Sequence, residues 1–172
     1  PHGWAFNMNN ISVIKKKVYA LIEKVLAYKT NMIIAISAWE KESAIKYKIC
    51  CSDKIHIIPS GVDVCLYDEE RGRYDLNRSK LKIPLNAYII GMVGRISYGK
   101  GPDLFIKAAA LIKEKIPNAF FVIVGDGEER ASVENLLSEM RLKDDFLITG
   151  WVSNPIEYIQ LFDQAMLLTR WE

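Results

Sequence analysis

Short apolar strand patterns alternate with helix patterns along the second half of the chain, and this alternation constrains the fold most. Four apolar runs have the length of buried strands, at residues 88–93, 119–124, 146–149 and 165–168. Apolar residues recur at helical spacing in three intervening segments, at 102–115, 128–142 and 155–162. Strands that are joined by helices pair in parallel through right-handed crossovers. The second half is therefore predicted to be an α/β domain built around a parallel sheet.

The first half of the chain repeats this rhythm with fewer elements. A helix is predicted over 11–29, where apolar residues fall on one face and lysines cover much of the rest. A strand at 32–36, a helix at 38–48 and a second strand at 55–58 follow. Residues 61–85 contain a run of charged side chains and end near a proline, so we interpret them as a connection between two domains.

Composition excludes several classes of function. The chain has 172 residues, of which 23 are Lys or Arg and 21 are Asp or Glu, and its formal net charge is +2. A charge this close to zero gives no reason to expect nucleic acid as a partner. The apolar runs are much shorter than the about 20 residues that a membrane-spanning helix needs. Three cysteines without a CxxC pair indicate reduced thiols, so we expect a cytoplasmic protein.

From the two ends of the sequence, we expect that the chain is an internal fragment of a longer protein.

One loop carries the strongest chemical signal. Residues 94–101 join a predicted strand to the N-terminus of a predicted helix, and they contain three glycines together with Arg95 and Lys100. Glycines let the backbone come close to a ligand, while a helix N-terminus and two cations attract negative charge. Ligands of open parallel sheets bind at the carboxyl ends of the strands. The loop therefore predicts a diphosphate site, or else a glycine-rich turn with two solvated cations.

Two better-known nucleotide loops nearly match and stay open as alternatives. Residues 94–100 fit the GxxxxGK pattern of P-loop hydrolases, but Gly101 stands where Ser or Thr should hold magnesium. The dinucleotide pattern GxGxxG is absent, which disfavours an NAD-dependent oxidoreductase. Asp126 does end the next strand, as a ribose-binding carboxylate would, although aspartate is also a common turn former. No His, Cys, Asp or Glu cluster has metal-ligand spacing, so no metal is expected.

Seven motifs, in order, resemble those of the retaining glycosyltransferases of family 4, which have the two-domain GT-B fold. The motifs are His2-Gly3, IIAIS at 33–37, IIPSGVD at 57–63, the glycine-rich loop at 91–101, VIVGDGE at 122–128, Thr149-Gly150, and Asp163 with residues 169–172. Each motif alone is weak, but their order and rough spacing agree over almost the whole chain. Ser60 departs from the family pattern, which usually has Asn at this position.

The resemblance implies two Rossmann-like parallel-sheet domains, both incomplete in this chain. Residues 1–60 would be the C-terminal part of the N-terminal, acceptor-side domain, and 61–85 would connect the domains. Residues 86–172 would be a truncated domain that binds the donor nucleotide sugar. The Rossmann strand order would place the strand at 165–168 beside the strand at 88–93. A fragment of this kind is expected to be inactive by itself.

The resemblance also implies a reaction. A hexose would move from a nucleotide sugar to a hydroxyl acceptor, with retention of the anomeric configuration and without a metal. The donor would be a UDP-sugar or a GDP-sugar, and no cofactor is implied. The resemblance assigns three groups of residues: Gly94, Arg95 and Lys100 to the donor diphosphate, Gly125, Asp126 and Gly127 to the nucleotide, and His2 and Glu172 to catalysis. A homologue that binds nucleotide without catalysis is an alternative.

The lysine-rich helix at 11–29 raises a hypothesis about location. A basic amphipathic helix can lie on an anionic membrane surface, and many acceptors of such enzymes are linked to lipids. Peripheral contact at the inner face of the membrane is therefore a hypothesis. The simpler interpretation is a domain helix whose lysines face solvent.

Overall fold

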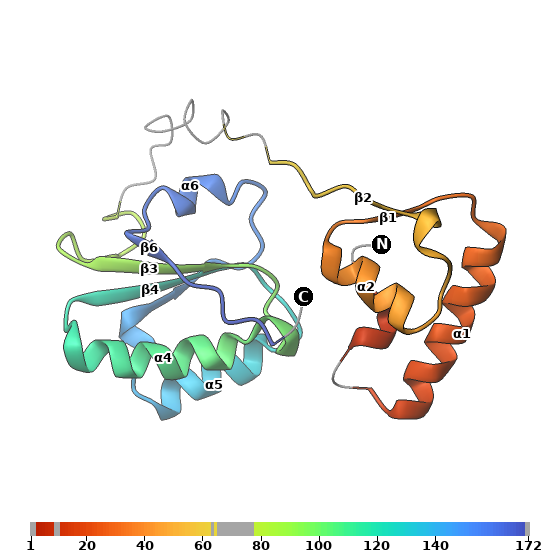
Figure 1. Cartoon of the computed structure of the whole chain (residues 1–172). Helices are drawn as coiled ribbons and strands as arrows, with labels where there is room; N and C mark the ends of the chain where they lie inside the picture. The colour runs from red at the N-terminus through yellow and green to blue at the C-terminus, as the bar shows by residue number, and fades with distance from the viewer. Residues whose placement is uncertain (1–2, 9–10, 63, 65–77, 171–172) are drawn as a thin grey trace. The chain divides into compact units, whose positions relative to one another are not determined.

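A four-stranded parallel sheet organises the second half of the chain (Figure 1). The computed structural model describes residues 3–8, 11–62, 64 and 78–170. The chain divides into two units, Pro1–Asp63 and Val64–Glu172. Within the described residues, no helix is both long enough and apolar enough to cross a bilayer.

The sheet of the second unit has the strand order β5-β4-β3-β6. Its strands are β3 (Tyr88–Val93), β4 (Ala119–Val124), β5 (Phe146–Ile148) and β6 (Gln164–Ala165). All three pairings are parallel, and β6 lies beside β3, so the predicted neighbour is confirmed. β6 is shorter than predicted because the chain leaves the sheet after the amide of Met166 has donated to the carbonyl of Gly91 at 2.8 Å.

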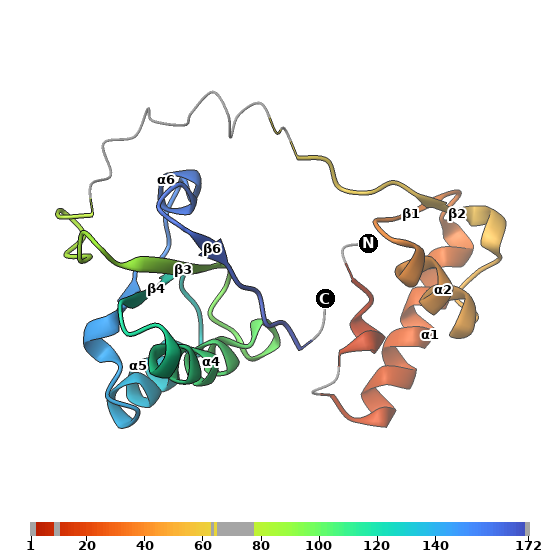
Figure 2. The same cartoon turned by 60° about the vertical axis from the view of Figure 1, so that its left-hand side comes forward.

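Three helices flank this sheet: α4 (Pro102–Lys115), α5 (Arg130–Glu139) and α6 (Ile156–Ile159). Helices α4 and α5 lie on one face and α6 on the other (Figures 1 and 2). The bounds of α4 agree with the sequence prediction, and Pro102 occupies its first turn. Helix α5 begins two residues later than predicted, after Glu129, whose amide donates to the carbonyl of Ile96 in the neighbouring loop.

The central strand β4 explains why the sheet is buried on both faces. All six of its residues are buried. Phe121 packs with Phe105 and Phe146 on the side of α4 and α5, with ring centroids 4.9 to 5.9 Å apart. Phe120, Val122 and Val124 belong to a separate apolar cluster that includes side chains of α6 and its flanking residues. Continuous burial of this kind is typical of a parallel sheet that is covered by helices on both sides.

The first unit contains a smaller parallel sheet. Its elements are a 3₁₀ turn η1 (Ala5–Asn7), α1 (Val13–Lys29), β1 (Ile33–Ala35), α2 (Ala38–Lys46), a second turn η2 (Ser52–Lys54) and β2 (Ile55–Ile57). β1 and β2 pair in parallel, as the sequence predicts for a βαβ arrangement. Ser37 caps α2, since its hydroxyl accepts a hydrogen bond from the amide of Glu40 at 3.2 Å.

Helix α1 faces its own unit with small residues rather than with its large apolar ones. Ala20 and Ala27 are its buried residues. Ile14 and Leu21 are 75% and 62% exposed, and four more large apolar side chains of the helix are also exposed: Val18, Ile22, Val25 and Leu26. The amphipathic pattern that predicts the helix is therefore present, but the described residues of its own unit leave its large apolar face uncovered.

Gly91 lies at a close contact between β3 and the segment after α6. It lies in the middle of β3, where a glycine weakens a strand unless another group needs the space. A Cβ atom at this position would fall on the ring of Phe162, which follows α6. The strand therefore has a glycine because an aromatic ring packs directly against its backbone.

We expect Gly91→Ala to lower the free energy of unfolding by about 1–3 kcal/mol, because Phe162 must leave its packed position. Urea denaturation followed by circular dichroism would measure the change. Gly61→Ala is the matched control, because no atom lies within 4 Å of an added Cβ there. Replacing Phe162 by Leu in the Gly91→Ala background should recover part of the loss. No recovery would mean that the ring is not the cause.

Candidate functional site

The loops that follow β3 and β4 are joined by backbone hydrogen bonds at the carboxyl end of the sheet. The amide of Gly94 donates to the carbonyl of Val124 at 3.0 Å, and the amide of Ile96 donates to that of Asp126 at 2.9 Å. The side chain of Ile96 is fully buried and anchors the loop in the core. The residue between these anchors, Arg95, is consequently held at a defined position on the surface.

Two glycines of the second loop are needed for this close packing. Gly125 has a φ of 145°, and a Cβ there would fall on the carbonyl oxygen of Gly94. A Cβ at Gly127 would meet the carbonyl oxygen of Ile96. The sequence analysis predicts that these glycines bind the nucleotide. The structure shows that the close packing of the two loops also requires them.

A cavity of about 420 Å³ opens beside the joined loops. It is lined by Val93, Gly94, Arg95, Val124, Gly125, Asp126, Trp151, Val152 and Pro155. Its size is within the range of small-molecule sites, and its lining is mainly apolar with a cation and a carboxylate at the edge. Four residues that the sequence predicted for the site therefore lie together around one cavity: Gly94, Arg95, Gly125 and Asp126.

Arg95 has an acidic partner in this structure. Its Nε donates to Oε2 of Glu128 at 3.0 Å, and the two side chains are 72% and 54% exposed. Ion pairs that are this exposed contribute between 0 and about 1 kcal/mol. The pair is therefore weak enough for an anionic ligand to displace Glu128 from Arg95. Glu128 was not predicted as a site residue.

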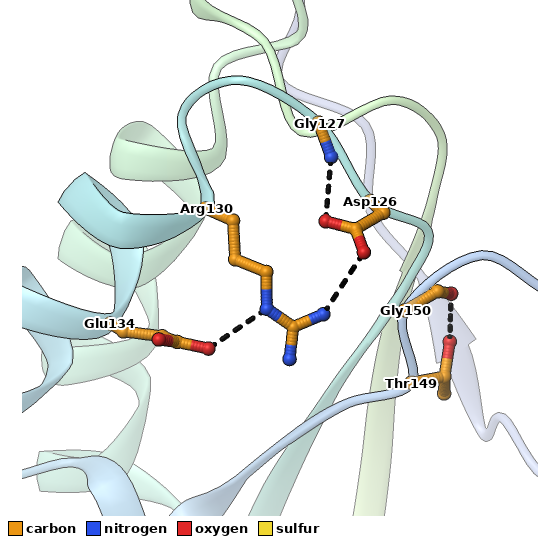
Figure 3. Close-up of polar contacts among 6 residues, drawn as sticks. All are labelled: Asp126, Gly127, Arg130, Glu134, Thr149 and Gly150. Atoms are coloured by element: carbon orange, nitrogen blue, oxygen red, sulfur yellow. Dashed lines mark hydrogen bonds and ion pairs between the residues drawn. The ribbon is translucent and has the colours of Figure 1, made fainter.

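Asp126 acts as a turn former here (Figure 3). Its Oδ1 accepts a hydrogen bond from the amide of Gly127 at 2.8 Å, and its Oδ2 accepts one from Nη1 of Arg130 at 3.4 Å. Arg130 is held from its other side by Glu134, with an Nε–Oε1 distance of 2.8 Å. The hydrogen bond that Arg130 donates to Glu134 is the main reason that the pKa of Arg130 is raised. The Asp126 carboxylate is thus fixed at the edge of the cavity.

The segment after β5 supplies the third wall of the cavity. The amide of Thr149 donates to the carbonyl of Ile123 at 3.0 Å, and Gly150 forms a β-bridge with Gly125. Trp151 follows directly, lines the cavity and is 79% exposed. Sequence reasoning missed this residue. An aromatic side chain immediately after Thr149-Gly150, at the end of a predicted strand, could have identified it.

The second predicted cation lies at the other end of the glycine-rich loop. Lys100 ends a 3₁₀ turn, η3 (Tyr98–Lys100), directly before the N-terminus of α4. Gly101 follows with a φ of 65°, which favours glycine, and Pro102 begins the helix. The described lining of the cavity therefore includes Arg95 but not Lys100. Between them, the loop runs from the cavity to the helix N-terminus.

The predicted catalytic pair is not tested by the structure, because His2 and Glu172 lie outside the described residues. Asp163 has a structural role, because its Oδ2 accepts a hydrogen bond from the amide of Ile89 at 2.7 Å. Among the described residues, no group of three or more His, Cys, Asp or Glu could hold a metal ion.

Comparisons with known proteins agree with this architecture. The family model "Glycosyl transferases group 1" matches residues 74–172. The UDP-Gal:alpha-D-GlcNAc-diphosphoundecaprenol alpha-1,3-galactosyltransferase of Escherichia coli is 33% identical over 174 residues, which cover 99% of this chain and 45% of that protein. The chain thus spans less than half the length of this relative.

Solved structures show the same fold at lower identity. The Anabaena protein HepE in complex with UDP and glucose superposes with a TM-score of 0.81 at 18% identity, over 98% of this chain and 45% of that chain. Its complex with UDP-glucose gives a TM-score of 0.76 at 19% identity, over 89% of this chain and 42% of that chain. The Rossmann-like parallel sheet therefore matches part of a glycosyltransferase, and, since the family model covers more than half of the chain, this chain belongs to the group 1 glycosyltransferases.

Proposed function

We propose that the chain is part of a retaining glycosyltransferase that moves a hexose from a UDP-sugar to a hydroxyl acceptor. Family membership supports the reaction class. Uridine is favoured over guanosine because the name of the Escherichia coli relative includes UDP-Gal and the Anabaena protein was crystallised with UDP-glucose. The observation that carries the proposal is the cavity at the carboxyl ends of β3 and β4, with Arg95 at its edge.

Domain roles follow from the same proposal. Residues 1–60 would belong to the acceptor-side domain of a GT-B enzyme, 61–85 to the connection and 86–172 to the donor-binding domain. The parallel pairing of β1 with β2 supports a Rossmann-like fold for residues 1–60. The strand order β5-β4-β3-β6 supports a Rossmann-like fold for residues 86–172. Because the chain spans 45% of the Escherichia coli relative, we propose that it binds donor without transferring sugar by itself.

The cavity and the glycine-rich loop beside it suit the two parts of a nucleotide. Val93, Val124 and Trp151 offer apolar surface for a uracil ring. Arg95 and Lys100 would hold the diphosphate, Arg95 with two N–H donors and Lys100 as a point charge. The pyrophosphate gains negative charge as the bond from the anomeric carbon to its oxygen breaks, and fixed cations stabilise that charge. In this proposal His2 and Glu172 face the donor sugar, a role that rests on the resemblance alone.

Removal of either cation should weaken the binding of UDP. We expect Arg95→Ala and Lys100→Ala each to lower the affinity by about tenfold or more, because a hydrogen bond to a charged group contributes about 1.5–3 kcal/mol. Isothermal titration calorimetry with the 172-residue chain would measure the affinity of each variant for UDP. Lys115→Ala, at the far end of α4, is the control and should bind as the wild type does.

The same titration separates the alternatives. UDP should bind more tightly than GDP, ADP, ATP or NAD, and magnesium should not be required. Magnesium-dependent binding of ATP would instead favour a hydrolase, and tight binding of NAD an oxidoreductase. Wild-type affinity for UDP in the Arg95→Ala variant would contradict the proposed site.

Glu128 should oppose the binding of the donor. We expect Glu128→Gln to raise the affinity for UDP by about two- to fivefold, because Arg95 no longer has to exchange a carboxylate for a phosphate. Glu139→Gln is the matched control, since Glu139 is an exposed carboxylate at the C-terminal end of α5. Weaker binding in the Glu128→Gln variant would mean that Glu128 helps to hold Arg95 in its binding position.

A peripheral membrane contact through α1 is proposed as well. The exposed side chains of Ile14, Leu21 and Val25 form an apolar face, and the helix also carries five lysines: Lys15, Lys16, Lys17, Lys24 and Lys29. We therefore propose that the protein acts at the cytoplasmic face of an anionic membrane, where a lipid-linked acceptor would be within reach.

We expect the chain to sediment with phosphatidylglycerol vesicles at low salt and to be released at high salt, because the lysine contribution is screened. Leu21→Glu should abolish sedimentation, whereas Leu111→Glu, at an exposed position of α4, should not. Absence of wild-type sedimentation at low salt would contradict the membrane contact.

A further inference from the structure

The segment that follows β6 contacts the glycine-rich loop, although the two are about 70 residues apart in the sequence. The amide of Arg170 donates to the carbonyl of Gly99 at 2.8 Å. The carbonyl of Leu168 occupies the place where a Cβ of residue 101 would lie, so this position must be glycine. The backbone of the loop is therefore in contact with the chain on both sides of Lys100.

The side chain of Arg170 makes this contact much stronger. Its Nη1 and Nη2 donate to Oδ1 and Oδ2 of Asp103 at 2.8 and 2.6 Å, which is a two-pronged ion pair. Nη1 also donates to the carbonyl of Tyr98 at 2.7 Å, and the guanidinium lies 4.2 Å above the Tyr98 ring. With side chains only 20% and 31% exposed, Arg170 and Asp103 are shielded from water far better than Arg95 and Glu128.

These contacts bracket Lys100. Tyr98 lies two residues before it and Asp103 three residues after it, and one guanidinium holds both. The pair also changes the local charge. Asp103 lies in the first turn of α4, where its carboxylate would otherwise repel an anion near Lys100. The hydrogen bond from Arg170 is the main cause that lowers the pKa of Asp103, so the ion pair persists at neutral and mildly acidic pH.

We propose that Arg170 is a positioning residue for the donor diphosphate: it fixes the loop that carries Lys100 and cancels the charge of Asp103. The inference rests on the proposed function of this site. Arg170 does not itself need to touch the donor. It acts by keeping the loop in one conformation before the nucleotide arrives, which reduces the entropy that binding would otherwise cost.

Calorimetric titration of the 172-residue chain with UDP tests this role. Arg170→Met should lower the affinity by about tenfold, the order of loss that a small misplacement of a binding group can cause. Arg170→Lys keeps the charge but loses the two-pronged geometry, and a loss of about threefold is expected. Arg170→Met combined with Asp103→Asn should bind UDP more tightly than Arg170→Met alone. Without Arg170, the Asp103 carboxylate keeps an ion pair with the more exposed Lys107 at 3.7 Å, and the second substitution removes the remaining negative charge.

A control must separate positioning from a general loss of stability. Lys113 makes a comparable ion pair at the other end of α4, where its Nζ lies 2.8 Å from Oδ1 of Asp145. Lys113→Met should lower the free energy of unfolding in urea and leave the affinity for UDP unchanged. All titrations would be made at a temperature at which each variant is folded by circular dichroism.

The outcomes distinguish this inference from the proposed function. Suppose that Arg170→Met loses no more affinity for UDP than Lys113→Met does, while Arg95→Ala loses UDP binding. The positioning role of Arg170 is then wrong, and the proposed donor site is still supported. If the wild type does not bind UDP, or if Arg95→Ala binds it normally, the proposed function fails first. Should Arg170→Met not fold, Arg170→Lys decides the question, because wild-type affinity in that variant would overturn the inference.

Discussion

The backbone contact between the loops after β3 and β4 is the constraint on which the rest of the site depends. Hydrogen bonds from Gly94 and Ile96 to the second loop hold the two segments together, and glycines at 125 and 127 allow the approach. A parallel sheet leaves its strand ends as separate loops, each free to vary. In this chain they form one surface, so that Arg95, Asp126 and Trp151, from three different segments, line the same cavity.

Charge at this end of the sheet is arranged in pairs. Arg95, Arg130 and Arg170 each have a carboxylate partner, but their exposures differ. Arg95 is mostly in water and bonds Glu128 through a single nitrogen, so little free energy is needed to redirect it. Arg170 is mainly buried and holds Asp103 with two nitrogens. We therefore expect one arginine to respond to a ligand while the other stays in place as part of the scaffold.

Much of the fold could be predicted from the sequence because its signals are local. Apolar runs identify β3 and β4 with their observed bounds, and the proline and helical spacing identify α4. The signals weaken where tertiary contacts decide the outcome. β6 ends after two residues, and the segment that follows it instead reaches the glycine-rich loop, where the amide of Arg170 donates to the carbonyl of Gly99. Helix α5 begins after Glu129, whose amide donates to the carbonyl of Ile96 in another loop. Arg170 and Asp103 are 67 residues apart in the sequence, and nothing in the local sequence indicates that they form an ion pair.

The contact of Leu168 and Arg170 with the glycine-rich loop also has a consequence for the order in which the protein is made. The loop leaves the ribosome with β3, but the segment that fixes it follows about 70 residues later. Contacts between distant parts of a chain form late, because the loop that they close must first lose its entropy. A nascent chain that has already formed the pairing of β3 with β4 would therefore still lack a rigid glycine-rich loop. The proposed nucleotide site would be complete only when β6 and the segment that follows it are in place.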